Sequence, residues 1–259
     1  MIDEVAEYAL YVAFLLACAI PLSGYINKVM AGEKNLLSCV VAPVERAACK
    51  VLGVDRFEQM GWKKYLATAL IFSIVSFVGL IAILMLQGVL PFNPQGFAGL
   101  SWDLAFNTAA SFVSNTNWQS YSGESTLSYF SQAIGLTVQN FVTPAVGIAV
   151  LFALFRGLVA EGGEGLGSFW VDVVRAVLGI LLPLSLVLAI VDVAQGSPQN
   201  MSDYQTTQLV EPVGVTDEGD IVAPDDSEAV EVVDEMAVPM GPQASQVAIK
   251  QLGTNGGGY

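Results

Sequence analysis

The sequence has no histidine among its 259 residues. Histidine is a usual ligand of haem, of many zinc sites and of the non-haem iron facial triad. Its absence argues against redox cofactor chemistry. The three cysteines, Cys18, Cys39 and Cys49, lack the close pairing of a zinc or redox motif, so we interpret them as reduced structural residues.

Charged residues are also scarce. They make up 13% of the chain, whereas soluble domains contain roughly 25%. Hydrophobic residues make up 54%, and the mean hydropathy is +0.58. This composition indicates a membrane protein. The net charge of −14 does not contradict that interpretation, because the acidic residues are concentrated in a few stretches.

Four uncharged stretches approach or exceed the length of about 20 apolar residues that a spanning helix needs. The first has no basic residue before it and no convincing small-residue cleavage site, so we expect a retained helix rather than a signal peptide. The predicted spans are Tyr8–Asn27, Tyr65–Val89, Ser125–Phe155 and Ala176–Val191, the last extending back through Phe169 and Trp170.

Basic residues between the spans are confined to two segments. Cytoplasmic loops near helix ends carry the excess of lysine and arginine. The N-terminus, Pro91–Glu124 and Gly196–Ile249 contain no basic residue, so we predict that these three segments lie outside. The residues predicted to lie inside are Lys28, Lys34, Arg46, Lys50, Arg56, Lys63, Lys64, Arg156 and Arg175.

The long segment Gly196–Pro239 is rich in proline, glycine, glutamine and acidic residues. Asp203 through Glu235 supplies eleven of the acids. We expect either a loosely ordered loop or a small cap. Its negative field would raise the local cation concentration modestly, or the segment is simply a solubilising external surface; the sequence leaves both interpretations open.

A short apolar stretch, Ser101–Val113, lies between the second and third predicted spans. It would reach only about 20 Å as a helix, too short for a hydrocarbon core of roughly 30 Å, so it must enter and turn back. Ser101 is a plausible N-cap, and Asp103 complements the helix dipole in the first turn. The polar run Ser114–Gln119 follows at membrane depth, where irregular backbone is tolerated only inside protein or beside a watery cavity. We therefore predict a pore-lining loop whose carbonyls favour a cation.

The same arrangement recurs after the fourth predicted span. Met240–Leu252 is a second short helical stretch, with Pro242 near its start, and Gly253–Tyr259 follows it. Glycines permit the unusual dihedral angles that point successive carbonyls the same way. Two such units in a row suggest an internal repeat, although the Thr-Asn pairs align in more than one register.

Two segments resemble a known family. Phe112–Glu124, which contains Ser-Asn-Thr-Asn-Trp-Gln, resembles the first selectivity-filter segment of the potassium-binding A subunit of the Kdp potassium pump, and Gly253–Tyr259 resembles its second. The similarity runs through nearly all of the chain. Other matching stretches are Val44-Glu45-Arg46, Gly61-Trp62-Lys63-Lys64-Tyr65, Val138-Gln139-Asn140-Phe141, Trp170-Val171-Asp172 and Leu182-Pro183-Leu184-Ser185.

The resemblance implies an all-α polytopic protein of the cell membrane, built from potassium-channel-like helix, pore-helix, helix repeats. We expect four full spans, two re-entrant half-helices and an N-terminus outside. Residues 1–64 would form the first span and a basic cytoplasmic loop. Residues 65–155 would form the first repeat with filter 114–119. Residues 156–259 would form a second repeat with the acidic outer loop 196–239 and filter 253–258. Because the family has four repeats, we expect this chain to be an incomplete subunit.

The resemblance also implies the ion and the partners. K+ is the transported ion, with no covalent cofactor. The expected partners are the ATP-hydrolysing B subunit, the small C subunit and the lipid bilayer, with no nucleic acid. Backbone carbonyls would coordinate K+, while asparagine and threonine side chains hold the loops. The implied filter residues are Ser114, Asn115, Thr116, Asn117, Gln119, Thr254, Asn255, Gly256, Gly257 and Gly258.

Two other functions remain open at this point. The chain contains neither a phosphate-binding loop ending in Gly-Lys-Ser or Gly-Lys-Thr nor an Asp-Lys-Thr-Gly phosphorylation motif, so we do not expect it to hydrolyse ATP itself. A passive channel or ion-coupled potassium transporter would use the same repeat unit. A membrane scaffold that binds other subunits without conducting is the third possibility.

Overall fold

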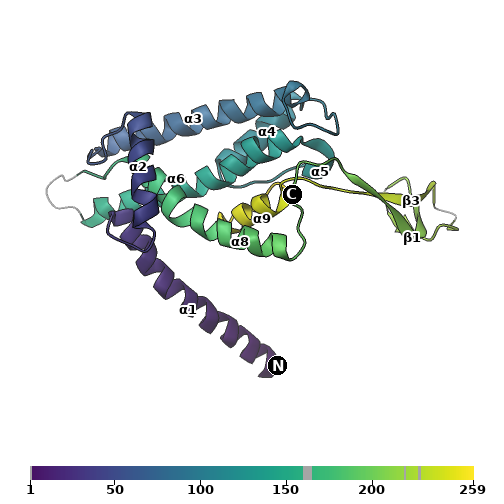
Figure 1. The fold of residues 1–259 in the computed structure, drawn as a ribbon, viewed down its shortest axis with the longest axis horizontal. Helices are drawn as coiled ribbons and strands as arrows, with labels where there is room; N and C mark the ends of the chain where they lie inside the picture. Colours follow the sequence, from purple (N-terminus) through teal and green to yellow (C-terminus); the bar gives the residue numbers. More distant parts are fainter. Residues whose placement is uncertain (1, 160–164, 219, 227–228) are drawn as a thin grey trace.

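The computed structural model describes residues 2–159, 165–218, 220–226 and 229–259. The protein is mainly helical (Figure 1). Its helices are α1 (Ile2–Ala31), α2 (Ser38–Leu52), α3 (Trp62–Leu86), η1 (Gln87–Val89), α4 (Trp102–Val113), α5 (Gly123–Thr126), η2 (Ser131–Leu136), α6 (Thr137–Val159), α7 (Phe169–Arg175), η3 (Ala176–Leu181), α8 (Leu182–Ala194) and α9 (Gln243–Leu252). The strands are β1 (Gln205–Val215), β2 (Ile221–Val222) and β3 (Glu231–Val238).

Among the described residues, four helices are long and apolar enough to cross a membrane, which confirms the predicted number of spans. They cover Val5–Ala31, Trp62–Val89, Ser131–Val159 and Phe169–Ala194. The third span begins later than the predicted Ser125, because Gly123–Thr126 forms the separate short helix α5. The chain is therefore a helical polytopic membrane protein.

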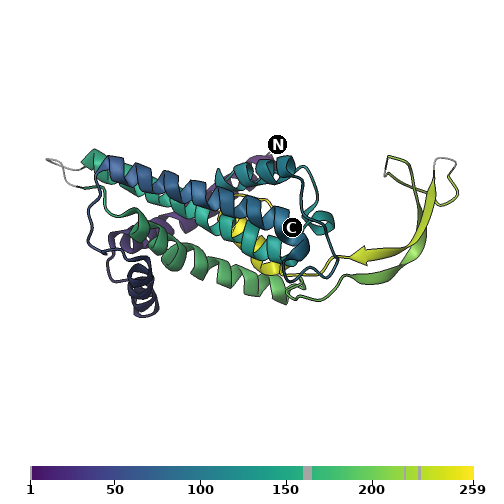
Figure 2. The same cartoon turned by 90° about the horizontal axis from the view of Figure 1, so that it is seen from above.

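Helices α3, α6 and the continuous α7–η3–α8 segment form the body of the bundle, and the two shorter helices α4 and α9 lie among them (Figure 2). A stripe of small buried residues, Ala145, Ala149 and Ala153, allows α6 to pack closely. The ring of Phe169 meets Tyr65 edge-on, with ring centroids 5.6 Å apart. These contacts fix the spans that surround the short helices.

Helix α1 joins the bundle only near its C-terminal end and diverges from it toward the N-terminus (Figure 1). Pro183 has no N–H, so the carbonyl of Gly179, one turn earlier, lacks a helical donor. The hydroxyl of Tyr25 donates to this carbonyl at 2.6 Å. Val29 packs beside Gly179, where an added Cβ would lie only 2.5 Å from Val29 Cγ1. A proline in the fourth span thus creates the docking point for the first.

Buried ion pairs gather where α1 ends and α6 and α7 meet, which we call the basic end. Arg156 donates to both carboxylate oxygens of Asp172, at 2.7 and 2.9 Å. Arg175 and Arg56 both donate to Glu45. The loop after α2 and the loop before α7 are joined here by backbone hydrogen bonds, including Met60 N–H to Gly167 at 2.9 Å.

At the other end of the bundle, the acidic segment forms a three-stranded antiparallel sheet in the order β2-β1-β3. The described part of this segment is thus folded, as the cap alternative expected, rather than a loosely ordered loop. The long β1–β3 hairpin projects away from the helices (Figure 1), and we call this the hairpin end. Its base is held by Tyr204, whose hydroxyl donates to the Glu124 carbonyl, and by Tyr129, whose hydroxyl donates to Ser202 at 2.7 Å. Burial raises the pKa of Tyr204 to about 12, so this hydroxyl keeps its proton at neutral pH.

Candidate cation-binding site

The short helices α4 and α9 both begin at the hairpin end and point into the bundle. They contain 12 and 10 residues, so they reach only about 15 to 18 Å. Ser101 occupies the N-cap position of α4 without a side-chain capping bond, and Asp103 lies in its first turn, as the sequence predicts. The second short helix starts at Gln243 rather than the predicted Met240, because Gly241 and Pro242 form a turn. The two loops that follow meet in the interior.

The structure resolves the register between the two units, which the sequence left ambiguous. Equivalent positions are 139 residues apart, because three backbone hydrogen bonds at the end of α4 recur at the end of α9. Thr116 N–H donates to Ser111 at 3.0 Å, and Asn255 N–H donates to Lys250 at 3.1 Å. The Asn115 N–H donates to Phe112, as the Thr254 N–H does to Gln251. The Ser114 N–H donates to Ala110, as the Gly253 N–H does to Ile249.

Both loops have left-handed residues at alternate positions. In the first loop these are Asn115 (φ 63°) and Asn117 (φ 56°). In the second they are Thr254 (φ 59°), Gly256 (φ 84°) and Gly258 (φ 112°). A positive φ is strained for a β-branched residue such as threonine and is found mainly where surrounding contacts enforce it. The shared pattern of positive φ angles turns the peptide groups of the two loops in the same directions.

Asn255 ties the loops together and to the third span. Its Nδ2 donates to Asn115 Oδ1 at 2.8 Å and to the Asn140 carbonyl at 3.1 Å. That carbonyl is free because Pro144, four residues later, has no N–H to offer it. Thr143 also donates to Asn115 Oδ1, at 2.7 Å. Pro144 in α6 therefore provides an anchor for the second loop.

The end of the second loop is held by one bond from the first loop and one from its own helix. Gln119 Oε1 accepts the Gly258 N–H at 2.7 Å, and Gln246 Oε1, on α9, accepts the Tyr259 N–H at 3.2 Å. Gly257 lies directly against the first loop, since a Cβ added there would be 2.6 Å from the Asn117 carbonyl oxygen. Only glycine fits at this point of close approach.

The site is rich in neutral amide groups. In the part of the chain that the structure describes, Asn117, Asn140, Asn255 and Gln139 each have a buried side-chain oxygen without a hydrogen-bond partner. No group of three or more acidic, cysteine or histidine residues lies together among the described residues. Neutral oxygen donors suit a monovalent cation that sheds its hydration shell, whereas Ca²⁺ sites are usually built around carboxylates.

Two cavities flank the first loop. One, of 260 Å³, lies between α3, α4 and α6 and is lined by Asn115, Gln139 and Thr143, with serines from α3. The other, of 490 Å³, is lined by Ser114, Thr116 and Gln119. Both cavities thus give space for a small polar ligand next to this loop.

The predicted filter residues are not equally engaged. The structure joins Asn115 to Asn255, Gln119 to Gly258 and Asn117 to Gly257 across the two loops. The hydroxyls of Ser114 and Thr116 bond each other at 3.0 Å, and the Ser114 hydroxyl also bonds the Ser111 carbonyl at 3.2 Å, so these two side chains make their bonds within the first unit. A Cβ added at Gly256 would meet none of the described atoms within 4 Å. Trp118, which lies within the same run, is 78% exposed.

Sequence reasoning gave no role to the side chains that support the loops. They lie on η2, on α6 and on α9. The residues on α6 could have been found from the sequence, because amides and a hydroxyl near a proline inside a spanning helix indicate functional positions. These supporting residues are Gln132, Asn140, Thr143 and Gln246.

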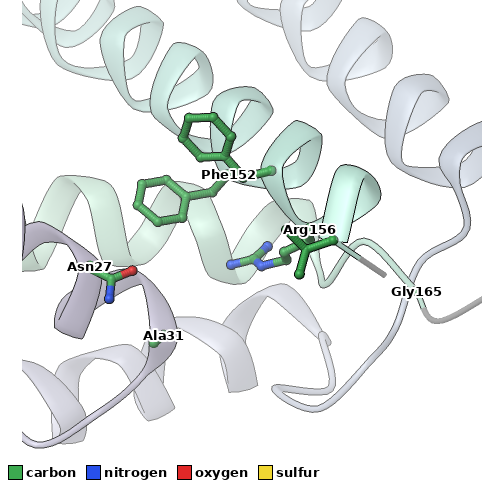
Figure 3. Close-up of a pocket in the computed structure, with 7 residues that line it drawn as sticks. Asn27, Ala31, Phe152, Arg156 and Gly165 are labelled. Carbon is green, nitrogen blue, oxygen red and sulfur yellow. The ribbon is translucent and has the colours of Figure 1, made fainter. Parts of the chain in front are cut away.

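A further cavity, of 470 Å³, lies at the basic end between α1 and α6. Figure 3 shows Arg156 beside Asn27 and Phe152 in this space. Among the described residues that line it, the charged side chain is the Arg156 guanidinium, which is paired with Asp172. The other described side chains that line it are mainly apolar, so the loops, with their amide and carbonyl oxygens, remain the better candidate site.

Comparisons with known proteins agree with this geometry. The family model described as potassium-transporting ATPase A subunit matches residues 9–259. A protein of Desulfovibrio desulfuricans named potassium-transporting ATPase potassium-binding subunit is 57% identical over 96% of the chain. Proteins of the same name from Clostridium botulinum and Clostridium perfringens are each 52% identical over the whole chain. The chain spans 41% of the length of the first relative and 43% of the other two.

Proposed function

The chain belongs to the potassium-transporting ATPase A subunit family, and from that membership we propose that it supplies part of the potassium site of an ATP-driven uptake pump. The observation that carries this proposal is the pair of equivalent loops, 114–119 and 253–258, joined by the Asn115–Asn255 hydrogen bond. The complete subunit would add the remaining loops around the same axis. It would bind K+ and pass the ion to an ATP-hydrolysing partner without hydrolysing ATP itself.

We propose that α4 and α9 are re-entrant pore helices. Their C-terminal ends, which carry the negative partial charge of the helix dipole, point toward the loops and favour a cation there. Residues 65–155 would then form one channel-like repeat and residues 156–259 the beginning of a second. Residues 1–64 would add the first span and a basic loop. The matched register of the two units supports this division.

Orientation follows from charge. The ion pairs of the basic end involve residues from both predicted inner loops, and excess lysine and arginine marks the cytoplasmic side. We therefore propose that the hairpin end and the N-terminus face the outside of the cell membrane. Potassium would reach the loops from the hairpin end. The B subunit and the small C subunit are the proposed partners.

Replacing Asn255 with alanine in the complete subunit should raise the half-saturating Rb+ concentration for uptake about tenfold. The variant removes two hydrogen bonds that hold the loops, each of which contributes on the order of 1 kcal/mol. The measurement is Rb+ uptake by the assembled complex in vesicles supplied with ATP. Asn35→Ala is the matched control, because that asparagine has only local bonds at the basic end. An unchanged half-saturating concentration for Asn255→Ala would contradict a role for these loops in ion binding.

The same vesicles distinguish the proposed pump from a channel or a scaffold. Uptake that stops when ATP is removed supports the pump subunit. Uptake that continues without ATP, following the Rb+ gradient or a co-transported ion, would instead show a passive or ion-coupled transporter. If neither Asn255→Ala nor Gly257→Asp alters uptake, the result would support a scaffold role for this chain.

Deleting the hairpin is expected to have a small effect. Residues 205–238 can be replaced by a short Gly-Ser linker, which leaves the bonds of Tyr129 and Tyr204 at its base in place. Because exposed charges are screened beyond about 8 Å at physiological salt, we expect less than a threefold rise in half-saturating Rb+ at 150 mM salt and a larger rise at 10 mM. A large rise at both salt concentrations would show that the hairpin acts by contact rather than by its field.

A further inference from the structure

Lys250 has an unusual position. Of the ten lysines and arginines in the sequence, it is the one that belongs to a predicted filter unit rather than to the loops of the basic end. It lies in the last turn of α9 and is 9% exposed. Its carbonyl accepts the N–H of Asn255 at 3.1 Å, and Asn255 directly precedes the Gly256–Gly258 run. A positive charge therefore lies within a few residues of a proposed cation site.

The register of the two units shows what Lys250 replaces. Its equivalent in the first unit is Ser111, whose Oγ accepts the Trp118 N–H at 2.5 Å behind the first loop. A hydroxyl can accept a hydrogen bond, whereas an ammonium group can only donate. The two units thus share a backbone but differ in charge at the same position.

The ammonium group is not neutralised by a close partner. Within the described residues, no carboxylate forms an ion pair with Lys250. A buried cation without a close counter-ion is costly, so its presence requires a reason.

The two half-helices are consequently unequal. A cation in the last turn offsets the negative partial charge at a helix C-terminus. The last turn of α4, all of whose residues are described, has no basic residue, and its first turn carries Asp103. The last turn of α9 carries Lys250. The first unit therefore attracts a cation more strongly than the second.

We propose that Lys250 is a positioning residue that weakens cation binding at the second loop, so that a bound potassium ion can leave the filter. This inference rests on the proposed function of the two loops. The ammonium group, at the C-terminal end of α9, opposes the field of that helix and keeps the combined site from binding the ion too tightly. Conduction requires binding that is strong enough to admit an ion and weak enough to release it.

The test uses Rb+ uptake by the complete assembled subunit. Lys250→Met keeps the length of the side chain and removes its charge, so it should lower the half-saturating Rb+ concentration about tenfold, as expected for unit charges about 10 Å apart at an effective dielectric constant near 20. It should also lower the maximal rate. Lys250→Arg should restore both values to nearly those of the native protein, and Lys63→Met, at the basic end, is the control. A half-saturating concentration that is unchanged or higher in Lys250→Met would overturn the proposal.

A second pair of variants decides the matter if Lys250→Met does not assemble. Ser111 borders the 490 Å³ cavity, which has room for a longer side chain. Ser111→Lys places the charge in the first unit, and Ser111→Ala removes only the hydroxyl. We expect Ser111→Lys to have a half-saturating concentration about tenfold above that of Ser111→Ala; equal values would refute the electrostatic role. If Asn255→Ala weakens binding while the lysine variants change nothing, the loops bind the ion and only the inference about Lys250 fails.

Discussion

Replacing Gly257 with aspartate in the complete, assembled subunit is expected to raise the half-saturating Rb+ concentration for uptake by about 100-fold or more, a loss of roughly 3 kcal/mol in binding. A Cβ at this position would lie 2.6 Å from the Asn117 carbonyl oxygen and 2.7 Å from Phe112 Cζ. The first of these neighbours is backbone, so the two loops must move apart. Overpacking of this kind costs about 1–3 kcal/mol, and a carboxylate beside the carbonyls adds a charge that distorts the site further.

Two alanine variants separate the contributions. Gly257→Ala introduces the steric clash without the charge and should cause a smaller rise than Gly257→Asp. Gly79→Ala is the matched control, because a Cβ on that glycine of α3 would meet none of the described atoms within 4 Å. The amount of assembled complex is measured for each variant. Native concentration dependence for Gly257→Asp in a normally assembled complex would rule out close approach of these loops at the ion site.

Asp172→Asn is expected to destabilise the subunit by about 1–3 kcal/mol, because it leaves a half-buried guanidinium without its anion. Asp172 is 1% exposed and accepts two bonds from Arg156 and one from the Tyr65 hydroxyl, at 3.0 Å. Arg156 also donates to the carbonyls of Leu166 and Met30. The pair therefore holds α1, α6 and α7 together at the basic end. The measurement is the midpoint of thermal unfolding of the complex purified in detergent, together with the amount of complex recovered.

The control for this prediction is a surface ion pair. Lys64 and Glu58 form an exposed pair, and exposed pairs contribute about 0–1 kcal/mol, so Lys64→Met should shift the unfolding midpoint little. The double variant Arg156→Met with Asp172→Leu removes both charges and should recover most of the lost stability. Equal unfolding midpoints for Asp172→Asn and the native protein would show that this ion pair is not structural.

The large-scale organisation could be predicted because it depends on composition and length. Each span is a run of apolar residues long enough to cross the hydrocarbon core of a bilayer. The two short helices are recognisable because 12 or 10 residues are too few to cross it. The start of the third span at Ser131 was not predictable from hydropathy, since residues 125–130 are uncharged as well. The sequence also did not decide whether the acidic segment folds, because its exposed strands lack the alternation of buried apolar and exposed polar residues that predicts a strand.

The details of the site depend on contacts between distant residues, which a single sequence does not display. The register of the loops became clear only from the matched bonds of Ser111 and Lys250. Asn140 belongs to a stretch that matches the family. Its carbonyl can accept a hydrogen bond from Asn255, 115 residues away, because Pro144 leaves that carbonyl without a helical donor. A proline inside a polar stretch of a spanning helix is the signal that could have indicated this anchor.

If the two loops bind one cation together, anomalous scattering from Rb+ should locate that ion between them. The experiment is a crystal structure of the complete assembled subunit grown in RbCl in place of KCl. We expect an anomalous peak between residues 114–119 and 253–258, within coordination distance of oxygens from both loops. A map with no peak there, or with its strongest peak in the Arg156 cavity at the basic end, would contradict this expectation.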